Sequence, residues 1–308
     1  AGRARHPGGA GAVTIRAAIL ALLTLLVAAC GQPDKQPPVA PDDPNPLLWE
    51  IARADGTSAG WLIGTIHALP DGVDWRTPAV DTAIAQAGVL AVEIAELDDQ
   101  RAVTSAFKPL AYSPGQPPLL SRVPANQRES LSALVADTPY GLDDFRGIES
   151  WGAALILSQS VDTGADAANG IDRALIRDFA GRRVVELEGA VRQFAVFDGL
   201  SERAQRAMLG AIVDEAEAEV DQRQRPIRLY LQGDEAGLAA LTREGLLADD
   251  EIREALLERR NAAWMPRITR LLESDSRPLI AVGAAHMVGT DGLVALIEAR
   301  GYTVRRVR

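Results

Sequence analysis

The chain has 308 residues, of which 47% are hydrophobic and 24% are charged, and its formal net charge is −10. These proportions are typical of a globular protein with a substantial core, and they exclude a disordered or collagen-like chain. The acidic balance also argues against nucleic acid as a partner, because contacts with phosphate groups favour a basic protein surface.

Residues 1–29 have the composition of a bacterial signal peptide. They carry Arg3, Arg5 and Arg16 but no acidic residue, and the apolar run "AAILALLTLLVAA" that follows is short for a membrane span. The sequence "VAAC" at 27–30 resembles the lipoprotein box, in which the cysteine is lipidated and becomes the first residue. Cys30 is the single cysteine of the chain, so we predict that it is the lipidation site. An ordinary signal peptide with an incidental cysteine is the alternative.

Residues 30–46 are rich in proline and predict an extended tether between the lipid and the folded part. Removal of residues 1–29 makes the chain still more acidic, so we expect it to touch the membrane through its lipid alone. The predicted location is therefore the bacterial cell envelope, lipid-anchored at the outer membrane and facing the periplasm. Residues 47–308 then form a single domain.

The folded part alternates strand and helix patterns. Two strands surround a turn at Asp55-Gly56, a helix is expected at 77–87, and a buried strand at 88–97. Residues 101–180 are mostly helical, and a strand follows Gly181, which ends a helix. Residues 200–273 are again helical, and the C-terminal segment predicts strand, loop, helix and strand. This order indicates an α/β (α+β) fold: a central mixed or largely parallel sheet flanked by helices, with a helical insertion.

Two histidines occur in the same local setting. His6 belongs to the signal segment, whereas His67 and His286 each follow an apolar strand in the pattern Gly-x-x-His, after Gly64 and Gly283. Residues just beyond the carboxyl ends of parallel strands line the ligand crevice of α/β folds. We therefore predict that both histidines face one site, the alternative being two structural histidines near strand ends.

Glu93 stands out among the acids because Val92 and Ile94 on either side of it are apolar. An ionised carboxylate in an apolar strand is costly unless it meets a metal ion, a cation or several donors. Glu186 and Glu188 lie two apart and would share one face of a later strand. The alternative for these acids is an edge strand with one polar face.

A helix near residue 260 carries polar side chains next to a tryptophan. Arg260 and Asn261 precede Trp264 at helical spacing, so they are expected to point inward, whereas Arg259 is expected on a solvated face. Asp172, in "NGID", fits either a helix cap or a functional acid.

Two imidazoles with a carboxylate can form a divalent-metal site with water in an open position. They can equally form a metal-free site with a general base and an electrophilic partner. The sequence has no H-E-x-x-H, Cys/His cluster, G-x-S-x-G or phosphate loop, which disfavours serine-hydrolase and nucleotide chemistry.

Several ordered segments together resemble the TraB/GumN family of bacterial proteins. The resemblance covers residues 47–307, and its segments are "LLWEIARADGTSAGWLIGTIHALP", "LAVEIAEL", "NGIDRALIRDFAGRRVVELEGAVRQFAVFDGLS", "YLQGDEAGLAAL", "ERRNAAWMPRITRLL" and "LIAVGAAHMVGTDGLVALIEARGYTVRRV". It implies kinship with TIKI-type metalloproteases and, more distantly, with erythromycin-esterase-like hydrolases.

The resemblance implies a working site of His67, His286 and Glu93, which would be catalytic residues and metal ligands. Matching positions for substrate binding or support are Gly64, Glu188, Gln193, Asn261 and Gly283, and Arg260 is expected to stabilise an oxyanion. The predicted function is a metal-dependent hydrolase, most consistent with a peptidase acting on a peptide or another small envelope substrate. A non-catalytic lipoprotein that binds a peptide or saccharide is the alternative.

Overall fold

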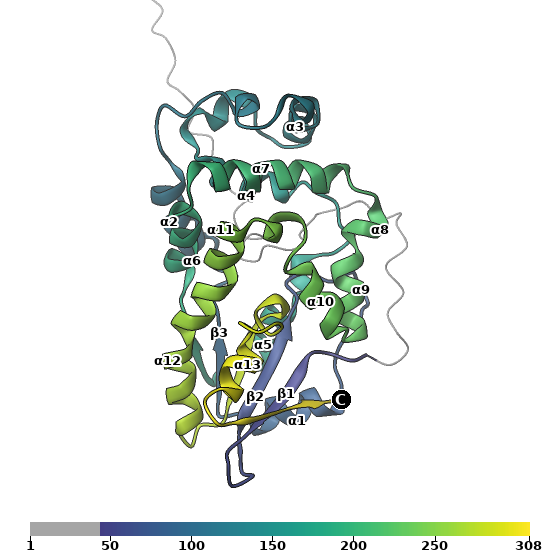
Figure 1. Ribbon diagram of the computed structural model, residues 1–308, viewed down its shortest axis with the longest axis vertical. Helices are drawn as coiled ribbons and strands as arrows, with labels where there is room; N and C mark the ends of the chain where they lie inside the picture. Colours follow the sequence, from purple (N-terminus) through teal and green to yellow (C-terminus); the bar gives the residue numbers. More distant parts are fainter. Residues whose placement is uncertain (1–43) are drawn as a thin grey trace, which may run out of the picture.

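The computed structural model describes residues 44–308 (Figure 1). The predicted signal peptide, Cys30 and nearly all of the predicted tether lie outside the described residues. Leu47, where the folded domain was expected to begin, is fully buried. Among residues 44–308 no helix has both the length and the apolar character needed to cross a membrane.

A six-stranded mixed sheet forms the base of the molecule. Its strands are β1 (Leu48–Ala52), β2 (Ser58–Thr65), β3 (Val89–Val92), β4 (Arg183–Glu186), β5 (Pro278–Gly283) and β6 (Thr303–Val307). Their spatial order is β4-β3-β5-β2-β1-β6. β4, β3, β5 and β2 run parallel, whereas β1 is antiparallel to both β2 and β6. The predicted mixed sheet flanked by helices is confirmed.

The first two strands form the predicted hairpin. Asp55 accepts hydrogen bonds from the backbone N–H and the hydroxyl of Thr57, at 2.9 and 2.6 Å, and Gly56 has φ +83°. An aspartate side chain that binds its own backbone two residues on, followed by glycine, favours a tight turn. Gly60 in β2 passes so close to β5 that a Cβ there would lie 2.5 Å from the carbonyl oxygen of Pro278.

Among residues 44–308, thirteen helices surround the sheet and extend beyond one edge of it. They are α1 (Pro78–Gln86), α2 (Gln100–Ala111), α3 (Arg128–Ala136), α4 (Ser150–Ser158), α5 (Ile171–Asp178), α6 (Ala190–Asp198), α7 (Glu202–Glu217), α8 (Val220–Arg223), α9 (Arg225–Gln232), α10 (Glu235–Leu241), α11 (Asp250–Arg253), α12 (Arg259–Glu273) and α13 (Leu293–Glu298). A π-helical segment, η6 (Glu254–Glu258), joins α11 to α12.

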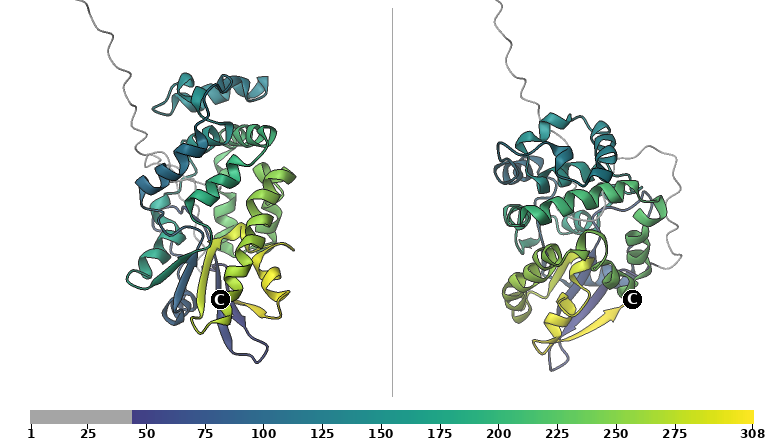
Figure 2. Two further views of the ribbon diagram at one scale, coloured as in Figure 1. Left: turned by 90° about the vertical axis from the view of Figure 1, so that its left-hand side faces the viewer. Right: turned by 45° about the horizontal axis from the view of Figure 1, so that its top comes forward.

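Helices α2, α3, α4, α6 and α7 form a separate helical layer. Figures 1 and 2 show this layer at one end of the molecule and the turn between β1 and β2 at the other. The carboxyl end of β2 therefore points toward the layer. The layer has its own aromatic core: Trp151 stacks on Phe197 at 5.9 Å between ring centroids, and Phe107 meets both Trp151 and Phe194 edge-on at 5.3 Å. The expected helical insertion at 101–180 accounts for α2 to α4, and α6 and α7 complete it.

Candidate active site

Both predicted site histidines lie just beyond the carboxyl ends of neighbouring parallel strands. β2 ends at Thr65, two residues before His67, and β5 ends at Gly283, three residues before His286. The two strands pair directly, with Thr65 opposite Gly283. Parallel pairing therefore brings together two side chains that are far apart in the sequence.

The two carboxylates reach the same edge from the next strands. Glu93 was expected inside a strand at 88–97, but β3 ends at Val92, so Glu93 is the first residue beyond the strand. Its backbone carbonyl accepts from the N–H groups of Glu188 and Gly189, at 3.3 and 3.0 Å. β4 likewise ends at Glu186, before Glu188. The carboxylate of Glu186 accepts from the N–H of Ala95 at 2.8 Å. Glu186 and Glu188 therefore do not share a role.

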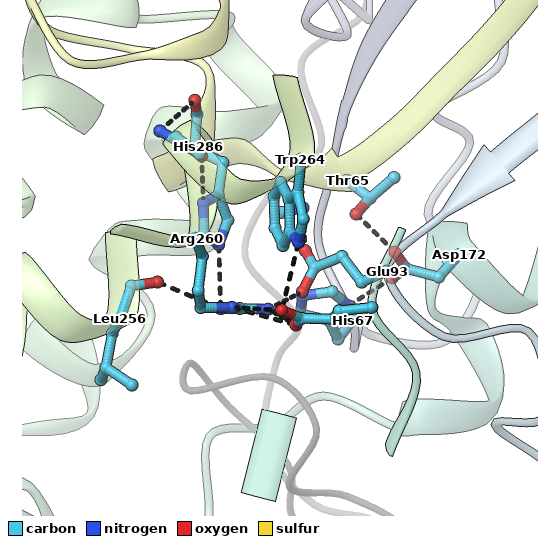
Figure 3. A network of polar contacts seen from close by, with 11 residues as sticks. Thr65, His67, Glu93, Asp172, Leu256, Arg260, Trp264 and His286 are labelled. Atoms are coloured by element: carbon cyan, nitrogen blue, oxygen red, sulfur yellow. Dashed lines mark hydrogen bonds and ion pairs between the residues drawn. The ribbon is translucent and has the colours of Figure 1, made fainter. Parts of the chain in front are cut away.

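His67 is held through Nδ1 by a buried acid. Nδ1 contacts Oδ2 of Asp172, and the other oxygen of Asp172 accepts from the Thr65 hydroxyl at 2.6 Å (Figure 3). Burial alone would raise the pKa of Asp172, but the charge and hydrogen bond of His67 and the bond from Thr65 hold it below its ordinary value. An ionised carboxylate can only accept, so Nδ1 of His67 carries the hydrogen and donates it to Asp172. The lone pair of the neutral ring is then on Nε2.

His286 is held in the same tautomer by an amide. The amide nitrogen of Asn261 donates to the carbonyls of His286 and Asp291, at 3.3 and 2.8 Å, so its oxygen faces Nδ1 of His286 at 2.7 Å. Nδ1 must then donate, and Nε2 accepts from Nη1 of Arg260 at 3.1 Å. Burial, together with the charges of Arg260 and His67, holds the pKa of His286 well below its ordinary value. His286 is therefore neutral at physiological pH.

His67, Glu93 and His286 converge on Gly283. A Cβ built on Gly283 would lie 3.3 Å from Nε2 of His67, 3.5 Å from Oε1 of Glu93 and 3.7 Å from Cδ2 of His286. The Gly283 N–H also donates to Oε1 of Glu93 at 2.8 Å. The absence of a side chain at this position leaves room between the three groups.

Arg260 lies at the centre of the polar network (Figure 3). Its Nη2 donates to Oε2 of Glu93 at 2.5 Å and also contacts Glu188, to which Nε donates at 3.0 Å. Its Nη1 donates to the carbonyl of Leu256 at 3.1 Å. The two carboxylates raise the pKa of Arg260 although burial acts against them, so the guanidinium is a permanent buried cation.

Trp264 lies one turn further along α12 and completes the support for this cation. Its indole N–H donates to Oε2 of Glu188 at 3.1 Å, and its ring lies 4.8 Å from the Arg260 guanidinium and 4.6 Å from the His286 ring. Burial raises the pKa of Glu188 even though Arg260 acts in the opposite direction. The inward orientation expected for Arg260 and Asn261 is observed, since the residues are 7% and 2% exposed.

Two of the three predicted metal ligands, Glu93 and His286, already accept hydrogen bonds from Arg260. Its guanidinium donates to Glu93 and to Nε2 of His286, which are atoms that a metal ion would need. Within residues 44–308 no group of three or more His, Cys, Asp or Glu side chains is arranged to hold a metal ion. The side chains as they lie therefore do not fit a metal ion, and Arg260 would have to move before one could bind.

The other predicted site residues have different environments. Gln193 is buried and lines the cavity described below. Gly64 is a packing position, because a Cβ there would lie 3.1 Å from the Leu47 side chain and 3.2 Å from Cα of Ala284. The Gly64 carbonyl accepts from the buried hydroxyl of Tyr230 at 2.8 Å.

Thr65 is a site residue that the sequence pattern did not single out, and Asp172 is one whose role the pattern left open. Asp172 was open between helix cap and functional acid, and the structure shows that Gly170 occupies the cap position of α5 while Asp172 faces His67. One feature of the sequence could have indicated this role. Asp172 lies in the first turn of a predicted helix, and the chain has few histidines with which a buried acid could pair.

A cavity of about 1050 Å³ opens from this edge of the sheet. His67, Glu93, Arg260 and His286 line it on the sheet side, and residues of α6 and α7 line it on the side of the helical layer. A volume of this size is at the upper end of the range for small-molecule sites. The network therefore faces a space that can hold a substrate.

A model of the TraB/PrgY/gumN family matches residues 47–306, which is most of the chain. The chain therefore belongs to the TraB/PrgY/gumN family. Comparisons with curated proteins and with solved structures find no match.

The two imidazole tautomers are testable by ¹⁵N NMR of histidine-labelled protein. In the neutral form of each ring, His67 and His286 are both expected to carry the proton on Nδ1. Asn261→Ala should change only the His286 signals and should lower the free energy of unfolding by about 1–3 kcal/mol, because it leaves a buried Nδ1–H without an acceptor. The exposed Asn126→Ala should stay within about 0.5 kcal/mol of wild type. A neutral His67 or His286 ring that carries its proton on Nε2 in the wild type would contradict the assignment.

Proposed function

We propose that this member of the TraB/PrgY/gumN family is a hydrolase, most consistent with a peptidase, in which His67 activates water and Arg260 stabilises the oxyanion. The observation that carries the proposal is the pairing of His67 with Asp172 beside a buried guanidinium in one cavity. A carboxylate on Nδ1 fixes the ring and stabilises the imidazolium that forms when Nε2 takes a proton.

The proposed reaction balances with these side chains alone. Nε2 of His67 removes a proton from water as the water oxygen adds to the substrate carbonyl. The carbonyl oxygen becomes an oxyanion, which Arg260 stabilises. When the intermediate collapses, His67 returns the proton to the leaving amine, and the acid and amine products are released. His67 thus takes up the proton, and the positive charge of Arg260 stabilises the negative charge that develops on the carbonyl oxygen.

The neutral state of His286 supports the role of Arg260. A protonated His286 would repel the guanidinium of Arg260, because both groups would be positively charged. The neutral ring instead accepts a hydrogen bond from Arg260. Glu93 and Glu188 hold two other parts of the guanidinium. The positive charge of Arg260 is therefore fixed in place before substrate enters, which is the condition under which a charge stabilises a transition state most strongly.

Substitutions in the network should separate catalysis from folding. We expect His67→Ala to lower kcat for a fluorogenic peptide library at least about 100-fold and Asp172→Asn to lower it about 10–100-fold. Glu93→Gln should also impair turnover, whereas Glu96→Gln, its exposed neighbour, should not. Gly283→Ala should fold but lose activity, because its methyl group enters the space beside Nε2 of His67. Substrate binding without turnover by the wild type would instead favour a non-catalytic binding protein.

We further propose a divalent cation held by His67, Glu93 and His286, as an addition that the reaction above does not require. Both imidazoles have Nδ1 fixed by an acceptor, as metal-binding histidines do. Such an ion would supply a Lewis acid, and Arg260 would have to withdraw for it to bind.

Metal binding has a readout that is independent of activity. Calorimetry with Zn²⁺ should show one site in the wild type, no site in His67→Ala, and at least about tenfold tighter binding in Arg260→Ala, since that variant lacks the competing cation. If Zn²⁺ still binds to a variant that lacks both His67 and His286, the proposed metal site is wrong. The metal-free reaction would be unaffected by that result.

We also propose that the protein is lipid-anchored in the cell envelope through Cys30, with its domain facing the periplasm. The support is the position of the single cysteine at the end of the predicted signal segment. Radioactive palmitate should label the wild-type chain in cells and should not label Cys30→Ser. Equal labelling of the wild type and of Cys30→Ser would refute the proposal.

A further inference from the structure

The cavity that contains His67 is apolar over much of its wall. Six of the apolar residues that line it come from α4, α6, α7, α10, η6 and the segment after α4: Leu155, Phe197, Ile212, Leu238, Leu256 and Val161. Small residues of α7, among them Ala207, Gly210 and Ala211, keep the wall open. An apolar substrate segment would therefore fit the middle of the cavity.

Three of the arginines that line the cavity, Arg122, Arg206 and Arg225, are already engaged. Arg206 donates to Glu202 at 2.6 Å, and Arg225 pairs with Glu244. Arg122 donates to backbone carbonyls, among them those of Pro117 and Phe145 at 2.9 and 2.7 Å. These cations add little attraction for an anionic substrate.

The acids that line the cavity differ in whether their carboxylates have a hydrogen-bond donor. They are Glu93, Asp214, Glu215 and Glu244. Glu93 accepts from Arg260, Glu244 from Arg225, and Asp214 from the amide of Gln127 at 2.5 Å. The carboxylate of Glu215, on α7, accepts no hydrogen bond and forms no ion pair with any residue in the described part of the chain.

Two further acceptors near this wall lack a donor. The amide nitrogen of Gln127 donates to the Gly210 carbonyl and to Asp214, which identifies Oε1 as the atom left over. The hydroxyl of Thr163 has no partner among the described residues either. Gln127 and Thr163 are 8% and 1% exposed and both line the cavity. Buried polar atoms without partners in a cavity wall are typical of a ligand site.

We propose that the helical-layer side of the cavity binds the ammonium group of a peptide with a free amino terminus, with Glu215 as its counter-ion. An ammonium group has three donors and no acceptor, which complements a carboxylate, an amide oxygen and a hydroxyl. Apolar side chains of the peptide fill the middle of the cavity, and a bond further along the peptide reaches His67. This inference rests on the proposed function and adds the class of substrate.

The cost of burying Glu215 supports this assignment. Burial raises the pKa of its carboxyl, although the charge of Arg223 acts in the opposite direction. Arg223 directs its Nη1 to the carbonyls of Ala216 and Ala218, at 3.0 and 2.7 Å, and its buried Nε has no partner among the described residues, Glu215 included. A raised carboxyl pKa means that the ionised form costs stability at neutral pH, and an arriving ammonium group would remove this cost.

Calorimetry with Leu-Leu-Leu-amide and its N-acetylated form tests the proposal. The measurement uses the chain with His67→Ala, so that turnover cannot consume the probe. We expect the free amine to bind at least about tenfold more tightly than the acetylated peptide. Adding Glu215→Gln should abolish this preference, whereas Glu219→Gln, an exposed acid four residues away, should keep it. Equal binding of both peptides, or a preference that survives Glu215→Gln, overturns the proposal.

A second variant protects the test against misfolding. Glu215→Gln should melt at the same temperature as the parent or higher, because it removes a buried charge. Thr163→Val keeps the side-chain shape, and it should weaken binding of the free amine by about 2–10-fold and leave the acetylated peptide unaffected. An unchanged preference in Thr163→Val also counts against the site.

The binding result is independent of catalysis. A preference for the free amine without turnover by the wild type would refute the hydrolase and keep the amine site. Turnover without such a preference would refute the amine site alone.

Discussion

The buried guanidinium of Arg260 is the group on which the arrangement of the site depends. It joins α12 to η6 and to the segments that follow β3, β4 and β5, because its donors reach Leu256, Glu93, Glu188 and His286. A buried cation is tolerated only where acceptors surround it, and removal of one partner leaves the others uncompensated. The same contacts hold His286 neutral and orient both carboxylates. Arg260 therefore links the ends of several strands and is also the cation proposed to stabilise the oxyanion.

The sheet explains why so few residues suffice to build this site. Four parallel strands end at one edge, and each provides a polar residue at or just beyond its last residue. The helices supply the second partners: Asp172 for His67 from α5 and Asn261 for His286 from α12. Each imidazole is thus fixed on a rigid strand end and oriented from a helix, which suits a site that must keep its geometry.

The strands and the convergence of the histidines could be predicted because both follow from local patterns. Apolar runs that end in Gly-x-x-His indicate strand ends, and parallel strands share an edge. The partners of the histidines could be predicted less well. Asp172 is one of 42 acidic residues, and only the packing of α5 against the sheet brings it to His67. The role of Arg260 as a competitor for the expected metal ligands depends on side-chain directions, which sequence spacing does not give.

The end of one strand and the type of one helix also differ from the sequence pattern for physical reasons. The apolar run at 88–97 predicts a long strand, but β3 is short because the chain turns at Glu93, where its carbonyl and carboxylate bind groups from other strands. The segment before Arg260 reads as a regular helix, yet η6 is π-helical. Periodicity cannot distinguish one extra residue per turn in so short a stretch.

That π-helical turn has a consequence for how such a site can change. A π-turn amounts to one inserted residue in an α-helix, and each helical residue rotates the following side chains by about 100°. Arg260, Asn261 and Trp264 all follow η6, and Leu256 within it offers its carbonyl to the guanidinium. Loss of a single residue from η6 would turn all three away from the strand ends without altering one of them. The register of α12 thus determines whether this fold has a site at all.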